Sequence, residues 1–383
     1  YTAAAVGIKQ DLEQNTQTFF GGLDYEKMQA KYTANWPCHQ DDITSIDVAH
    51  DKSKALAVTG ECGARSTIHV WDTNTMKSVN RFDLGDKAKG VAALAVSPCC
   101  RYVAVVDMCN DHNMSVYNIN KKKPIFCVSA GTDAIADIQW SRKLNDLRFA
   151  ALTSRALQFW HPADSSKKLF KNGAFGPSNT QTKFNSVVFD EDGVCYSGGA
   201  NGAIHCWDQR GELGLVLKAH SGECTAIVCH QNTLLSVGKD YKLCIHTANK
   251  GTFEFHKQID LEVQYIASSL DFLDGKVLIG HDNGAIATIE LESEYQTIHN
   301  NSHHDGECWG LEINPQKGTF YTSGDDNQFM EFDLNEKKLI RKGKVWTSDI
   351  NGGKSYENNK IRSTASTLSS FPAHQQSRAI TIS

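Results

Sequence analysis

The stretch Phe184–Asp208 reads FNSVVFDEDGVCYSGGANGAIHCWD and contains the pattern that decides the fold. Apolar residues alternate with small or polar ones in its first six residues, and a period of two is that of a β-strand. A second strand ends at Gly198, a tight turn carries Asn201-Gly202, and a third strand closes on Trp207-Asp208. Asn-Gly tolerates positive φ and favours a hairpin. The stretch therefore predicts antiparallel strands joined by short turns.

The same pattern recurs seven times along the chain, and a fourth, more polar strand leads to each following unit. The first strands begin at Ile43, Val91, Ile135, Phe184, Cys224, Ala267 and Cys308, between 40 and 49 residues apart. Third strands close on Trp71-Asp72, Tyr117-Asn118, Trp160-His161, Trp207-Asp208 and Phe332-Asp333. Four strands per unit that close on Trp-Asp or its variants are typical of a WD-repeat β-propeller blade. The predicted fold is all-β, a propeller with seven recognisable blades plus terminal pieces of a possible eighth.

The ends of the chain divide into three predicted parts. Residues 1–342 form the propeller, residues 343–376 a polar linker or surface loop, and residues 377–383 a further strand. That last strand, Arg378–Ile382, either closes the ring by pairing with the N-terminal strands or opens a second propeller. The choice between seven and eight blades stays open.

Two N-terminal strands are expected, at Thr2–Lys9 and Thr16–Phe20, and a short helix is expected at Asp24–Lys31. The chain opens at Tyr1 instead of at a methionine, so we expect it to be a piece of a longer protein.

Composition excludes several classes of partner. The chain has 39 basic and 44 acidic residues, a net charge of −5, which argues against nucleic acid. No apolar run approaches the ~18 residues of a membrane span. Its 12 cysteines are scattered without the framework of a secreted disulfide-rich domain, so we expect reduced thiols and a cytoplasmic location.

The chain resembles a known family at three places. Asp41-Asp42-Ile43 followed by Ala55–Gly60, the stretch Val105–Tyr117, and Asp305–Leu311 resemble the WD repeats of echinoderm microtubule-associated protein-like proteins. Tyr1–Phe20 resembles the end of the hydrophobic motif that precedes their first propeller. The resemblance covers essentially the whole chain, as the first of two tandem propellers. It implies microtubules and other cytoskeletal or axonemal proteins as partners, although the upstream basic and coiled-coil region of some members is not in this sequence.

Catalytic motifs are missing from the sequence. No Gly-x-Ser-x-Gly elbow occurs, and Gly352–Ser355 lacks the strand and helix that a phosphate-binding loop needs. The first strands should line the central channel with apolar or small residues and supply no acid–base set. The carboxylate pairs Asp41/Asp42, Glu191/Asp192 and Asp325/Asp326 are interpreted as solvated turns. We therefore predict no enzyme activity and no cofactor.

Histidines near cysteine or aspartate are candidate metal ligands. His303-His304-Asp305 with Cys308 could be drawn as a zinc site, but a turn before a first strand explains these residues better. His220 is interpreted in the same way, as a histidine that hydrogen-bonds within its blade, with Asp240 as its partner. No metal site is predicted.

Clusters of basic residues are the candidate partner contacts. They are Lys121, Lys122, Lys123, Lys167, Lys168, Lys337, Lys338 and Arg341. Charge runs are usually solvated, and lysines also protect outer strand edges from pairing. Contact with an acidic partner such as the tubulin surface is the functional alternative.

The leading hypothesis is a non-catalytic scaffold that binds microtubules or a ciliary axoneme through its propeller faces, in the cytoplasm and cytoskeleton. The alternative is a substrate receptor of a ubiquitin-ligase-type complex. Pull-down of tubulin or of ligase subunits would separate the two.

Overall fold

The structure is a computed structural model in which most of the first 344 residues are described. These are residues 2–3, 6–11, 14, 16–21, 39, 41–49, 54–63, 65–85, 87–121, 124–143, 145–162, 170–175, 182–249, 251–263, 265–300, 308–324, 328–335 and 339–344. The chain divides into two compact units, Tyr1–Ile279 with Glu290–Tyr295, and Gly280–Ile289 with Gln296–Ser383. Within the described ranges every regular element is a strand. No helix of this part of the chain is long and apolar enough to cross a membrane.

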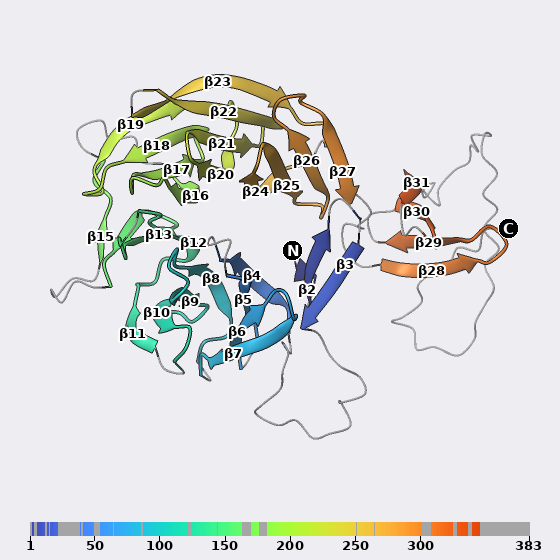
Figure 1. Ribbon diagram of the computed structural model, residues 1–383, viewed down its shortest axis with the longest axis horizontal. Helices are drawn as coiled ribbons and strands as arrows, with labels where there is room; N and C mark the ends of the chain where they lie inside the picture. The colour runs from blue at the N-terminus through green and yellow to red at the C-terminus, as the bar shows by residue number, and fades with distance from the viewer. Residues whose placement is uncertain are drawn as a thin grey trace, which may run out of the picture. The chain divides into compact units, whose positions relative to one another are not determined.

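Seven four-stranded sheets follow one another along the chain, each with its strands in sequence order (Figure 1). We call them blades 1 to 7. Blade 1 is β4 (Ile43–Val48), β5 (Leu56–Glu61), β6 (Thr67–Asp72) and β7 (Lys77–Asp83); blade 2 is β8 (Val91–Val96), β9 (Tyr102–Asp107), β10 (Asn113–Asn118) and β11 (Pro124–Ser129). Blade 3 is β12 (Ile135–Trp140), β13 (Phe149–Thr153), β14 (Leu157–Trp160) and β15 (Phe170–Asn172); blade 4 is β16 (Phe184–Phe189), β17 (Cys195–Gly199), β18 (Ala203–Trp207) and β19 (Leu213–Lys218).

Blade 5 is β20 (Cys224–His230), β21 (Thr233–Gly238), β22 (Lys242–Asn249) and β23 (Thr252–Asp260). Blade 6 is β24 (Ala267–Leu273), β25 (Lys276–His281), β26 (Ile286–Glu290) and β27 (Gln296–Asn300); blade 7 is β28 (Cys308–Asn314), β29 (Thr319–Gly324), β30 (Gln328–Asp333) and β31 (Leu339–Lys344). The division between the two compact units passes through blade 6. All seven first strands begin at the residue that the repeat predicts, so the predicted WD-repeat propeller fold is confirmed.

The N-terminal region forms a separate three-stranded sheet. Its strands are β1 (Thr2–Ala3), β2 (Val6–Asp11) and β3 (Thr16–Gly21), in the order β1-β2-β3. The single strand expected at Thr2–Lys9 is thus two strands, with residues 4 and 5 outside the described part. The expected helix at Asp24–Lys31 and the expected strand at Arg378–Ile382 also lie outside it. β31 continues to Lys344, just inside the segment expected to be a linker.

Side chains on the first strands connect successive blades. The first strands of blades 1 to 6 lie next to one another in chain order. The second residue of a first strand donates to the backbone carbonyl of the first residue of the next first strand at three places. These bonds run from Thr44 Oγ1 to Val91 (2.6 Å), from Asn185 Nδ2 to Cys224 (3.0 Å) and from Thr225 Oγ1 to Ala267 (2.5 Å).

These contacts also fix the direction of the strands. At the other end of blade 1, Asp47 Oδ2 accepts a hydrogen bond from the backbone N–H of Val96 (2.7 Å), so β4 and β8 run in the same direction. Successive sheets therefore present equivalent ends on one side. The turns after the first and third strands of blades 1 to 6 share one surface, which we call the turn face.

Apolar side chains fill the space between neighbouring blades. Val58, Ile68 and Val70 of blade 1 are fully buried and belong to one cluster with Val103 and Val105 of blade 2. Fully burying such a side chain contributes about 1.5–3 kcal/mol relative to its exposure to water. Blade stacking is thus a consequence of sheets that are apolar on both faces.

Two of the tryptophans that close third strands are hydrogen-bonded to the second strand beside them. Trp71 Nε1 donates to Thr59 Oγ1 (2.7 Å), and Trp207 Nε1 donates to Ser197 Oγ (2.8 Å). Both indoles are buried, so each N–H needs a partner to avoid a desolvation cost. This requirement explains why a hydroxyl residue faces each of these tryptophans.

Candidate interaction surface

Lys121 is one of the two candidate contacts within the described residues. It lies in the turn between β10 and β11, where its backbone N–H donates to the carbonyl of Asn118 (2.9 Å). Its side chain is exposed on the turn face of blade 2. The turn therefore presents this ammonium group to solvent, as a partner contact requires.

Arg341 is the second described candidate, and it has a carboxylate partner. It lies on β31, its side chain is 68% exposed, and its guanidinium forms an ion pair with Glu331, which is 7% exposed. The Tyr321 hydroxyl also donates to Glu331 (2.7 Å). Burial alone would raise the pKa of Glu331, but the bonds from Tyr321 and Arg341 outweigh burial and lower it. Part of the charge of Arg341 is thus used to hold this carboxylate.

The other candidates, Lys122, Lys123, Lys167, Lys168, Lys337 and Lys338, lie outside the described residues. Lys121 belongs to the first compact unit and Arg341 to the second. The candidate contacts as a set therefore stay a prediction.

The first strands, which were expected to line the central channel with apolar or small residues, also carry the carboxylates Asp47 and Asp137. Burial raises the pKa of Asp47 to about 6 and that of Asp137 to about 7, against hydrogen bonds from backbone N–H groups that lower both. Each carboxylate accepts from its neighbour in sequence and from the next blade, Asp137 from Ile138 (2.8 Å) and Val187 (3.4 Å). The free edge of the next first strand needs acceptors, which apolar side chains do not supply.

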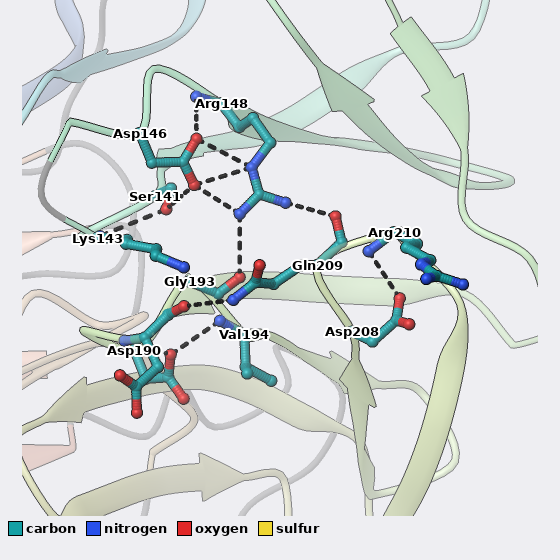
Figure 2. A network of polar contacts seen from close by, with 11 residues as sticks. Ser141, Lys143, Asp146, Arg148, Asp190, Gly193, Val194, Asp208, Gln209 and Arg210 are labelled. Atoms are coloured by element: carbon teal, nitrogen blue, oxygen red, sulfur yellow. Dashed lines mark hydrogen bonds and ion pairs between the residues drawn. The ribbon is translucent and has the colours of Figure 1, made fainter.

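A polar network spans blades 3 and 4 on the turn face (Figure 2). Arg148 Nε donates to both carboxylate oxygens of Asp146 (2.9 and 2.8 Å), and Ser141 donates to the same carboxylate (2.7 Å). Arg148 Nη1 donates a hydrogen bond to the backbone carbonyl of Gln209 on blade 4 (2.5 Å). Gln209 Nε2 in turn donates to the backbone carbonyl of Asp192 (3.0 Å).

Lys143 and Asn145 join Asp146, Arg148 and Gln209 around an open depression of about 410 Å³ beside this network. Sequence reasoning missed these residues. The one feature of the sequence that could have indicated this network is the length of the turn between β12 and β13. The polar atoms of Arg148 and Asp146 are used within the network, so it acts as a connection between two blades.

His220 bonds as predicted. Its Nδ1 lies 2.9 Å from Asp240 Oδ1, and its Nε2 lies 2.9 Å from Ser236 Oγ. Burial lowers the pKa of His220 and exceeds the opposite effect of Asp240. The histidine thus connects the turn before β20 to the second strand and the following turn of the same blade.

The described residues contain no group of three or more His, Cys, Asp or Glu side chains placed to hold a metal ion. Asp41 and Asp42 are exposed, and Asp41 Oδ1 accepts the backbone N–H of Asp42 (2.9 Å). Glu191 and Asp192 are likewise exposed in the turn after β16. The other pair, Asp325/Asp326, and the His303-His304-Asp305 stretch lie outside the described residues.

Seven four-stranded sheets, three of whose third strands carry Trp71, Trp160 and Trp207 at or next to their ends, define the class of WD-repeat β-propellers. Residues 35–269 match the family model described as the echinoderm microtubule-associated protein first beta-propeller. The chain belongs to this family.

Curated relatives share most of the chain. A ciliary WD repeat-containing protein, ctxp80, of Euplotoides octocarinatus is 32% identical over 92% of the chain, which corresponds to 48% of that protein. The 77 kDa echinoderm microtubule-associated protein of Strongylocentrotus purpuratus is 25% identical over 88% of the chain and 48% of its own length. Human echinoderm microtubule-associated protein-like 1 is 25% identical over 85% of the chain and 39% of its own length. The chain spans about half the length of the first two relatives, and less of the human protein.

Solved structures support the fold. The Cps50 (Swd1) beta-propeller domain of Myceliophteria thermophila superposes with a TM-score of 0.58 at 14% identity, covering 74% of this chain and 93% of that one. At this identity the likeness concerns the fold alone.

Proposed function

We propose that the chain is a non-catalytic WD-repeat scaffold that binds microtubules or a microtubule-based assembly such as a ciliary axoneme. The observation that carries the proposal is the family match, together with relatives whose names refer to microtubules and to cilia. Cytoskeletal or axonemal proteins would be its partners, and the cytoskeleton and cilium its location.

The geometry supports a role in binding. The turns of a propeller can differ in sequence without disrupting its blades, and here they are held on rigid sheets. Asp47 and Asp137, two first-strand carboxylates with raised pKa values, use their oxygens to accept hydrogen bonds from backbone N–H groups. That use favours a structural role for them over acid–base chemistry.

Cosedimentation with polymerised microtubules tests the proposal. We expect the chain to pellet with microtubules at low salt and to be released as salt rises, because binding through charged side chains is screened. Bovine serum albumin in the same tubes controls for trapping. A chain that stays in the supernatant at every salt concentration would contradict the proposal. None of the relatives named above points to a ubiquitin-ligase receptor, so we do not propose that alternative.

A further inference from the structure

The turn face has two halves of opposite charge. In blades 1 to 3 the described residues of the turns after the first and third strands, with those that flank them, include five exposed cations. These are Lys54, Lys77, Arg101, Lys121 and Lys143. Two further cations there are engaged, since Arg142 donates to the Cys229 carbonyl and Arg148 binds Asp146.

Among the described residues, the acidic side chains in the turns of this half are Asp72 and Asp146, and both are half-buried. Asp72 accepts the backbone N–H groups of Asn74 (2.9 Å) and Thr75 (2.8 Å), and Asp146 is held by Arg148. The described residues give the five exposed cations no carboxylate partner. Their charge is therefore available to a binding partner.

Blades 4 to 6 carry the opposite charge on the same face. Their turns expose Glu191, Asp192, Asp208, Glu212, Asp274, Glu290, Glu292 and Glu294. Of these acids, Glu294 pairs with Lys257 of β23 (2.7 Å). Arg210 and Lys276 are the exposed cations that the described residues place in or beside these turns. An acidic ligand would be repelled by this half and attracted by the other.

Apolar surface contributes little on the basic half. Val48 and Ile125 are the large apolar side chains that the described residues leave exposed near these turns. A stable dimer of two copies needs a larger apolar core than two separated side chains provide. Charge complementarity therefore favours a charged partner over a second copy of this chain.

We propose that the turn face of blades 1 to 3 is a docking surface for an acidic protein segment rich in Glu or Asp. The inference rests on the proposed function and assigns it a face and a ligand chemistry. The acidic half fixes the orientation of the partner, because like charges that face each other weaken the complex. Clustered exposed cations also raise the association rate, and added salt reduces this effect.

The test compares two variants that each remove two exposed positive charges. Lys121→Gln with Lys143→Gln removes them from the basic half, and Arg210→Gln with Lys276→Gln removes them from the acidic half. Binding of a short poly-L-glutamate peptide is measured by fluorescence anisotropy with the full chain over a series of salt concentrations. We expect the first variant to bind about three- to tenfold more weakly at low salt and with a shallower salt dependence. The second variant should bind like the wild type, or slightly more weakly through the long-range loss of charge.

Equal affinities for the two variants, or no binding of the peptide by the wild type at low salt, would overturn the proposed surface. Cosedimentation of the same variants with microtubules separates this failure from failure of the proposed function. If wild type and both variants pellet equally, the function stands and the surface is wrong. If the wild type does not pellet but binds the peptide in a Lys121- and Lys143-dependent way, the surface stands and its acidic partner is not the microtubule. Salt-sensitive self-association that both variants weaken would show a second copy as the partner and also overturn the proposal.

Discussion

At the scale of single residues, Asp137 shows how a half-buried carboxyl can serve the contact between blades. Its backbone partners stabilise the charged form, but burial has the larger effect and raises its pKa to about 7. An unfolded aspartate has a pKa near 3.9, so the native state binds more protons than the unfolded state between about pH 4 and 7. Stability contributed by this group therefore falls as pH rises through that window.

Replacing Asp137 by Asn should remove this pH dependence. The amide keeps one oxygen acceptor, whereas the carboxylate accepts from Ile138 on Oδ1 and from Val187 on Oδ2. At pH 8 the ionised carboxylate destabilises the wild type, so we expect Asp137→Asn to unfold at a higher urea concentration. The gain in the free energy of unfolding should be about 1–2 kcal/mol, because solvent screens the partly exposed carboxylate and limits its cost. Near pH 4 the two proteins should be equally stable. Asp208→Asn, an exposed turn residue, is the control. Parallel stability profiles for Asp137→Asn and wild type between pH 4 and 8 would refute the argument.

At the scale of elements, the hairpin turns decide where strands end. Gly202, between β17 and β18, has a φ of +78°, a backbone conformation that residues with a Cβ rarely adopt. An added Cβ would overlap the carbonyl oxygen of His220 and lie 2.5 Å from that of Gly222. The turn of blade 4 is thus packed against the residues that precede blade 5.

Gly275→Ala gives a matched control, because Gly275 has the same φ of +78° but no atom within 4 Å of an added Cβ. We expect Gly202→Ala to lower the free energy of unfolding by more than about 2 kcal/mol, and Gly275→Ala by about 1 kcal/mol from backbone strain alone. Thermal unfolding followed by circular dichroism would measure both. If both variants lost the same free energy of unfolding, the close contact of Gly202 with the neighbouring carbonyls would make no contribution to stability.

The sequence predicted the elements well because strand period and turn chemistry are local properties. Each first strand begins where alternation resumes after a turn, as at Cys224 after Ser221-Gly222. His220 and Asp240 could also be paired, because both lie at recurring turn positions. The contacts that Asp137 and Arg148 make between blades could not be predicted, since Val187 and the Gln209 carbonyl lie on the next blade. The division of the turn face into a basic and an acidic half could not be predicted either, because it depends on which turns share a surface.

At the scale of the whole molecule, stability depends on contacts between neighbouring sheets, as in other repeat architectures. Thr225 Oγ1 donates to Ala267 of the next blade (2.5 Å) and lies 3.1 Å from the Val237 carbonyl of its own blade. Thr225→Val should lower the free energy of unfolding by about 1–2 kcal/mol, because a carbonyl loses its donor. Thr247→Val, exposed on β22, is the control, and urea unfolding measures both. A Thr225→Val midpoint equal to that of the control would show that the bond between blades contributes nothing.

The bonds from Thr44, Asn185 and Thr225 each run from an earlier sheet to the one that follows it in the chain. A polypeptide leaving the ribosome exposes its N-terminal sheets first, and such segments fold while synthesis continues. Every new sheet of this kind finds a donor already in position on its predecessor. Assembly during translation can therefore proceed in one direction, with each completed sheet serving as the template for the next.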